Sequence, residues 1–106
     1  LLSKADNIGW TPAHAAAGGG HLETLRYLGD RPDGAALLSK ADNIGWTPAH
    51  AAAGGGHLET LRYLGDRPDG AALLSKADNR GLTPAHWAAD GGHLETLRYL
   101  GDRPDG

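Results

Sequence analysis

The feature that most constrains this chain is an internal repeat of 36 residues. Residues 1–36 (unit 1) recur without a change as residues 37–72 (unit 2), and residues 73–106 (unit 3) repeat the unit without its last two residues. Unit 3 differs from unit 2 at four positions, given as pairs: Ile44/Arg80, Trp46/Leu82, Ala51/Trp87 and Gly54/Asp90. Such a period is typical of domains built by stacking small units that bury their apolar faces against one another. We therefore predict a single repeat domain over residues 1–106.

The identity of units 1 and 2 bears on the origin of the chain. Natural repeats diverge because each unit meets different neighbours, so identity over a whole unit indicates either a very recent duplication or a deliberate copy. The composition is biased as well, with 17 glycines and neither phenylalanine nor methionine. We interpret the chain as an artificial or idealised repeat protein, for which recombinant cytoplasmic expression is expected.

Composition and charge argue against several classes of function. The chain carries 10 Lys and Arg against 13 Asp and Glu, a formal charge of −3, and 40% of its residues are apolar. Nucleic-acid binding needs a clustered basic face, which this balance does not favour. No apolar run approaches the roughly 20 residues of a membrane span, and no signal peptide opens the chain. Without cysteine there is no disulfide or sulfur ligand. We expect a soluble domain that binds neither membranes nor nucleic acid.

Turn and capping residues divide each unit into segments. Residues 6–9 predict a turn, since an Asp side chain can accept from the backbone ahead and Gly can adopt a positive φ. Residues 11–17 predict a helix, with threonine as its cap and proline in its first turn. The glycines at 18–20 end this helix. Because Asp90 takes the place of Gly18 in unit 3, we predict that Gly18 is still helical.

A second helix is predicted over His21–Leu28, with its leucines on one side and Glu23 within reach of Arg26. The arm that follows, Asp30–Ala41, allows two predictions. It forms a short helical turn capped by Asp33, or it runs extended to the next turn; we favour the helical turn. Stacking places the leucine stripe of one unit against the alanine-rich helix of the next, which predicts a helical solenoid.

The motifs of each unit resemble those of ankyrin repeats. They are Thr11-Pro12-Ala13-His14-x-Ala16-Ala17, Gly20-His21-Leu22-Glu23 and Leu25-x-x-Leu28, with copies at Thr47–His50 and Gly56-His57 and at Thr83–His86 and Gly92-His93. The resemblance covers the whole chain. It implies an all-α, ankyrin-like solenoid of three repeats, each a helix–turn–helix with a hairpin or loop arm.

Three departures from the ankyrin pattern bear on packing. The unit has 36 residues rather than 33, and the extra residues lie between Leu28 and Asp42, in the arm that carries the family's hairpin. Ala13 and its copies stand where the family generally has leucine. Gly29 and its copies stand where a second leucine is usual. These departures leave the shape of the arm and the volume of the core undecided. They do not change the predicted fold.

The six histidines suggest metal binding or catalysis, but their spacing favours structural roles. His14, His50 and His86 lie one unit apart, and stacked helices are about 8–10 Å from one another. Zinc ligands must lie within about 4 Å of each other. The ankyrin resemblance implies that the first histidine of each unit bonds near the Thr-Pro turn and the second supports the start of the second helix. We expect no metal site.

Other catalytic patterns are equally weak. Ser39 precedes a lysine, but no third group or oxyanion hole accompanies the pair. Residues 18–20 lack the lysine of a phosphate-binding loop and follow a helix rather than a strand. We expect no catalytic residue and no cofactor.

Three of the four substitutions in unit 3, Arg80, Leu82 and Asp90, coincide with positions that the resemblance assigns to partner binding, and Trp87 lies on the first helix just after the histidine. Ankyrin proteins bind partners on a concave face built from hairpin tips and the exposed side of the first helix. Tryptophan and arginine are also the residue types that dominate binding hot spots. The candidate binding residues are Ile8, Trp10, Ile44, Trp46, Arg80, Leu82, Trp87 and Asp90. Alternatively, unit 3 is a partial C-terminal cap, or it preserves the template from which the copies were made.

We conclude from the sequence that the chain is an artificial or idealised ankyrin-like scaffold without catalytic activity and without a required partner. The alternative is a protein-binding module that uses the concave face and hairpin tips.

The two ends of the predicted stack lead to a further expectation. Terminal repeats need a polar outer face, yet unit 3 keeps Leu94, Leu97 and Leu100, and unit 1 copies an internal unit. We therefore expect apolar, complementary end faces and head-to-tail self-association.

Overall fold

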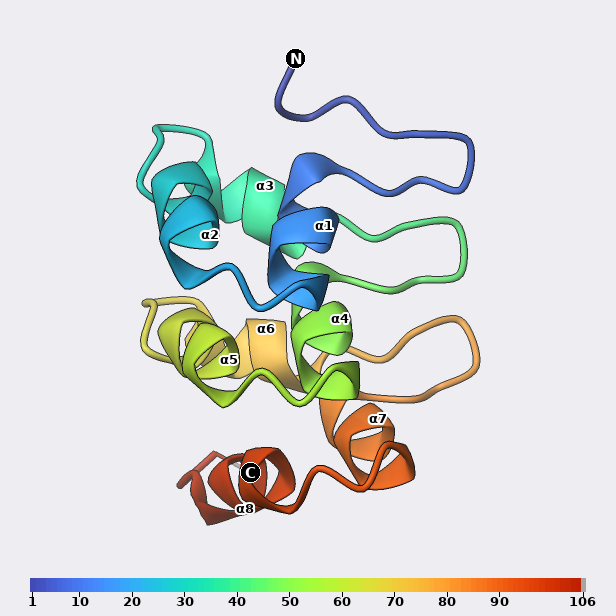
Figure 1. Ribbon diagram of the computed structural model, residues 1–106, viewed down its shortest axis with the longest axis vertical. Coiled ribbons are helices and arrows are strands. Elements are labelled where there is room, and N and C mark those ends of the chain that lie inside the picture. The colour runs from blue at the N-terminus through green and yellow to red at the C-terminus, as the bar shows by residue number, and fades with distance from the viewer. Residues whose placement is uncertain (106) are drawn as a thin grey trace.

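The structure, a computed structural model, describes residues 1–105 and is all-helical over that range. Each unit has a first and a second helix, and units 1 and 2 add a short arm helix. The helices are α1 (Pro12–Gly18), α2 (Leu22–Gly29), α3 (Gly34–Ser39), α4 (Pro48–Gly54), α5 (Leu58–Gly65), α6 (Gly70–Ser75), α7 (Pro84–Asp90) and α8 (Leu94–Asp102). The units stack along the long axis of the molecule, which measures 35 Å (Figure 1). The predicted helical solenoid is confirmed.

Figure 1 shows three columns of elements running through the stack. The first helices α1, α4 and α7 lie between the hairpin loops on one side and the second helices α2, α5 and α8 on the other. The core consists of leucines and alanines contributed by every unit. Within residues 1–105, no helix is long and apolar enough to cross a membrane.

The first helix of each unit begins and ends where the sequence predicts. Thr11 caps α1 in a capping box in which His14 plays the part usually taken by Glu or Gln. Gly18 is the last helical residue, which confirms that it is helical and not a cap. The chain leaves the helix at Gly20, whose φ of +72° favours glycine.

The predicted turn at residues 6–9 is the tip of a hairpin. One carboxylate oxygen of Asp6, Oδ1, accepts from the backbone N–H of Ile8 at 3.0 Å and of Trp10 at 2.9 Å. Gly9 has a φ of +88°. The Asp6 N–H donates to the carbonyl of Trp10 at 2.8 Å and closes the hairpin. The copies in units 2 and 3 repeat this pattern.

The second helix begins one residue later than predicted, at Leu22. His21 precedes it with φ −90° and ψ 81°, which is not a helical conformation. The predicted pair of Glu23 and Arg26 lies at 3.7 Å. The predicted leucine stripe is only partly buried, because Leu25 is fully covered whereas Leu22 is half-exposed.

The arm forms the short helix α3, so the helical prediction is correct and the extended one is wrong. Asp33 stands at the cap position, but its side chain makes no capping hydrogen bond and instead faces Arg31 at 3.4 Å. The arm helix holds its place by burying Leu37 and Leu38, which are 3% and 0% exposed. Tertiary packing therefore stabilises a helix that is too short to form on its own.

The arm helix also explains the glycine at position 29. A Cβ on Gly29 would lie 2.9 Å from Leu38 Cδ1 and 2.9 Å from Arg67 Nη1, and it would also meet the hydroxyl of Tyr63. The space that a leucine would need at this position is thus filled by the arm helix of the same unit and by the next unit. The longer repeat supplies the arm helix, and this helix occupies part of the space that a leucine at position 29 would need.

Candidate functional site

The eight candidate binding residues lie on the hairpins and on α7, which is the side of the stack away from the second helices (Figure 1). Ile8 and Ile44, at the hairpin tips, are each 58% exposed, and Arg80 occupies the same place in unit 3. The remaining residues are half-buried except for Asp90, which is exposed; they are Trp10, Trp46, Leu82 and Trp87.

The Trp10 indole lies along the first helix of its own unit. It stacks on the ring of His14 at a centroid distance of 5.6 Å. Its edge covers Gly18, where a Cβ would lie 3.4 Å from Trp10 Cη2. Its Nε1 donates to Asp42 Oδ2 at 3.1 Å and so joins unit 1 to the hairpin of unit 2.

Trp46 is the copy of Trp10 in unit 2. It does not make the equivalent hydrogen bond, because another residue donates to the acceptor. The acceptor equivalent to Asp42 is Asp78, and its Oδ2 accepts instead from Trp87 Nε1 at 3.0 Å. Within residues 1–105, Trp46 Nε1 is buried without a hydrogen-bond partner. Trp46 packs edge-to-face on Trp87 at 4.8 Å. Because of the substitutions in unit 3, Trp87 rather than Trp46 donates the hydrogen bond to Asp78 Oδ2.

Sequence reasoning missed this exchange, although a signal for it exists. Unit 3 loses tryptophan at the hairpin position, where it has Leu82, and gains tryptophan on the first helix at Trp87. The paired change predicts that one indole takes over from another. Its acceptor is not apparent from the sequence, because the Trp10 bond joins two units across 32 positions whereas the Trp87 bond lies within one unit.

Asp78 accepts three hydrogen bonds on this surface, as Asp42 does in unit 2. Burial raises its pKa, but hydrogen bonds from the backbone N–H of Leu82, the Trp87 indole and the backbone N–H of Arg80 outweigh burial, and the pKa lies below its ordinary value. Asp78 is therefore an anion at neutral pH. It anchors the hairpin and Trp87 together.

The first histidine of units 1 and 2 holds adjacent units together. The backbone N–H of Thr47 donates to His50 Nδ1 at 3.1 Å, so the ring proton lies on Nε2. Nε2 donates to the carbonyl of Leu82 in unit 3 at 2.9 Å. His14 bonds in the same way to Thr11 and to Trp46 of unit 2. Burial lowers the pKa of His50, which is consistent with a neutral ring.

The second histidine has a different role from the one the resemblance implies. It makes no capping hydrogen bond at the start of the second helix. Instead, Nε2 of His57 contacts the carbonyl of Gly18 at 2.9 Å, and Nε2 of His93 contacts that of Gly54 at the same distance. These histidines connect each unit to the one before it. Over residues 1–105, no three His, Asp or Glu side chains are grouped as metal ligands.

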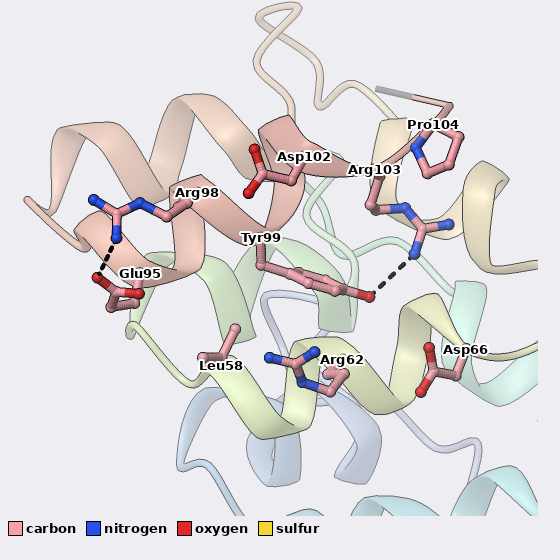
Figure 2. Close-up of a pocket in the computed structure, with 9 residues that line it drawn as sticks. All are labelled: Leu58, Arg62, Asp66, Glu95, Arg98, Tyr99, Asp102, Arg103 and Pro104. Atoms are coloured by element: carbon pink, nitrogen blue, oxygen red, sulfur yellow. Dashed lines mark hydrogen bonds and ion pairs between the residues drawn. The ribbon is translucent and has the colours of Figure 1, made fainter.

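An open groove of about 490 Å³ lies between α5 and α8 on the opposite side of the stack (Figure 2). Tyr99 lies across it, with the Arg62 guanidinium 5.0 Å from its ring centre and its hydroxyl accepting from Arg103 at 3.0 Å. Arg98 pairs with Glu95 at 3.1 Å. A smaller groove between α2 and α5 repeats this lining one unit earlier. The grooves therefore follow from the stacking of second helices.

The comparisons with known proteins agree with this architecture. The family model described as ankyrin repeats (3 copies) matches the chain over residues 1–72 and again over residues 34–105. No curated protein was found to match the chain.

Proposed function

The chain belongs to the ankyrin-repeat family, and we propose that it is a non-catalytic protein-interaction module whose partner contacts the hairpin tips and first helices. Ankyrin repeats are generally protein-interaction modules and are typically non-catalytic. The proposed contact residues are Ile8, Trp10, Ile44, Trp46, Arg80, Leu82, Trp87 and Asp90.

The observation that carries this proposal is the location of the four substitutions in unit 3. All four lie on the hairpin or on α7, and they alter one connected surface around Trp46 and Asp78. The leucines that face the core are the same in every unit. One change, Ala51/Trp87, falls at a position that is buried in unit 2. All four nevertheless spare the core leucines and gather on one surface, which is expected when recognition, rather than folding, distinguishes a unit.

The chemistry of this surface also supports protein binding. Exposed Ile8 and Ile44 lie beside half-buried tryptophans. Arg80 and Asp90 add opposite charges in unit 3. An aromatic and aliphatic centre with charged residues beside it matches the composition of protein interfaces.

The identity of units 1 and 2 supports a second interpretation, in which the chain is an artificial or idealised scaffold that requires no partner. The two interpretations agree that the chain is non-catalytic. They differ in what the unit 3 surface does, since only the binding module needs Arg80, Leu82, Trp87 and Asp90 for recognition.

A revertant of unit 3 tests the proposal without harming the fold. Arg80→Ile, Leu82→Trp, Trp87→Ala and Asp90→Gly together restore the sequence of unit 2, which already stacks in this solenoid. Immobilised chain and immobilised revertant would be compared for capture from a complex lysate. Each captured protein would then be purified and titrated by calorimetry.

The proposal expects a partner that binds the chain with a defined stoichiometry and binds the revertant at least tenfold more weakly. Equal affinity for both chains would locate the contact elsewhere and contradict the assigned surface. Capture of no titratable partner would favour the scaffold interpretation.

A further inference from the structure

We propose that the partner of the hairpin surface is an acidic protein segment, in which a carboxylate pairs with Arg80 and a neighbouring apolar side chain packs on Ile44. This pairing rests on the function proposed above and names the chemistry of the segment that the surface binds. Arg80 and Ile44 belong to adjacent hairpin tips, in units 3 and 2.

The tips of the three hairpins form one continuous row. The backbone N–H of Asn79 donates to the carbonyl of Ile44 at 3.0 Å, and that of Asn43 donates to the carbonyl of Ile8 at the same distance. These bonds place Ile8, Ile44 and Arg80 one after another along the row. Ile44 is 58% exposed although a hairpin lies on either side of its own (Figure 1). A side chain at this position therefore faces solvent even inside the stack.

Arg80 differs from the other arginines because it has no carboxylate to pair with. The other six each form an ion pair with an Asp or Glu two or three residues away, at 2.7–3.8 Å; they are Arg26, Arg31, Arg62, Arg67, Arg98 and Arg103. Within residues 1–105, the Arg80 guanidinium forms no ion pair and no hydrogen bond, and only its backbone N–H is engaged, with Asp78. Its guanidinium donors are therefore available to a partner.

The carboxylate of Asp78 is close to Arg80 in the chain but is engaged elsewhere. Its side chain belongs to a residue that is only 8% exposed. Oδ1 accepts from the backbone N–H groups of Arg80 and Leu82, and Oδ2 accepts from the Trp87 indole. Asp78 thus holds the hairpin together and leaves the guanidinium at the tip without a counter-ion.

The neighbours of Arg80 on this surface are apolar. Ile44 is the next residue along the row of tips, and half-buried Trp46 and Leu82 belong to the same two hairpins. A guanidinium can donate two parallel hydrogen bonds to one carboxylate. A partner that covers the apolar residues also removes water from this ion pair, which strengthens its contribution to specificity. The surface therefore favours a segment with an acidic residue next to an apolar one.

Three variants separate the charge of Arg80 from the rest of the surface. Units 1 and 2 carry isoleucine at this position, so Arg80→Ile restores a residue that the hairpin already accommodates. Arg80→Glu reverses the charge at an exposed tip. Arg98→Ile is the matched control, because it removes an exposed arginine from α8, on the opposite side of the stack (Figure 1). Circular dichroism verifies that all three fold.

The probe is a library of random peptides displayed on phage and selected on the immobilised parent chain. Selected peptides are synthesised and titrated by calorimetry against the parent, the three variants and the unit 3 revertant. Peptides that bind the parent but not the revertant should carry Asp or Glu next to a large apolar residue. Arg80→Ile should weaken their binding by about tenfold or more and Arg80→Glu by a larger factor, whereas Arg98→Ile should leave it unchanged.

A change in the peptide completes the test. Replacing its acidic residue by the corresponding amide should abolish the difference in affinity between the parent and Arg80→Ile. Peptides that lose affinity for the revertant but bind Arg80→Ile as tightly as the parent would overturn the pairing and leave the assigned surface standing. Peptides that bind the revertant as tightly as the parent, or a library without any binder, would instead contradict the assigned surface and the pairing with it.

Discussion

The two internal interfaces of this solenoid differ in the hydrogen bond to one carboxylate and in the packing of Trp46 on Trp87. Between units 1 and 2, Asp42 Oδ2 accepts from Trp10; between units 2 and 3, the equivalent oxygen of Asp78 accepts from Trp87. The histidine, asparagine and arginine bonds to main-chain carbonyls are the same at both interfaces. The indole N–H of Trp46 is left buried and without a partner among residues 1–105.

This comparison separates stacking from surface recognition. Stacking depends on the leucine and alanine core and on bonds from His, Asn and Arg side chains to main-chain carbonyls, and the four substitutions leave these donors unchanged. The hairpin surface depends on side chains, and four substitutions rebuild it while the stack stays intact. A repeat protein can therefore change the surface of one unit at little cost to the fold, which is the property that a binding module needs.

The largest expected effect compares a histidine inside the stack with its copy at the open end. His50→Ala removes a buried ring, deprives the Thr47 N–H of its acceptor, and removes one of the two donors to the Leu82 carbonyl, the other being the Asp78 N–H. It should lower the free energy of unfolding by about 3 kcal/mol or more. His86→Ala should cost about 1 kcal/mol, because the exposed ring bonds only within its own unit. Urea unfolding measures both values, and similar losses would contradict the account.

The next effect compares Trp10 with Trp46. Trp10→Phe loses the bond to Asp42, whereas Trp46→Phe removes an N–H that already lacks a partner in the described part of the chain. The first variant should be less stable than the second by about 1–3 kcal/mol. In a Trp87→Ala background Asp78 becomes free to accept from Trp46, so the difference should disappear. Chemical denaturation of the four proteins measures this, and a difference that persists would rule out the exchange of donors.

A third effect is the pH dependence that His50 confers. Burial lowers its pKa in the folded state below the ordinary value of 6.5, so the unfolded chain binds more protons below that pH. The contribution of His50 to stability is complete above about pH 6.5 and is lost as the pH falls toward the folded pKa. The free energy of unfolding should therefore drop as the pH falls below about 6.5, and the drop should be smaller in His50→Gln. Equal drops in both proteins would assign the dependence to other groups.

The smallest effect is a stabilisation. Gly18 and Gly54 end α1 and α4 in helical conformation, and a Cβ at either residue would lie 3.4 Å from the nearest tryptophan atom. Gly18→Ala and Gly54→Ala should each stabilise the fold by about 0.5–1 kcal/mol. Thermal unfolding measures the gain. A loss at Gly54 alone would indicate that Trp46 and Trp87 leave less room than Trp10 and Ala51.

Most of the fold could be predicted from the sequence because its signals are local. Thr11 and the proline after it mark a helix start, and Gly20 marks an exit, whatever surrounds them. The role of Gly29 could not be predicted, since it depends on Leu38 and on Tyr63 of the next unit. The bond from His57 to Gly18 likewise joins residues 39 positions apart.

The candidate surface was predictable in position but not in detail. The ankyrin resemblance assigns Trp46 and Trp87 to the same face. Which of the two donates to Asp78 depends on how Trp46 and Trp87 pack against each other across two units, and a sequence pattern within one unit does not contain that contact.

The most direct test of the donor exchange is the proton–nitrogen NMR spectrum of the three indole N–H groups. The account predicts that Trp10 and Trp87 show hydrogen-bonded, downfield indole protons with small temperature coefficients, while Trp46 resonates upfield of both. In Trp87→Ala, the Trp46 proton should move downfield to the position of Trp10. A downfield Trp46 proton in the parent chain, unchanged by that substitution, would contradict the account.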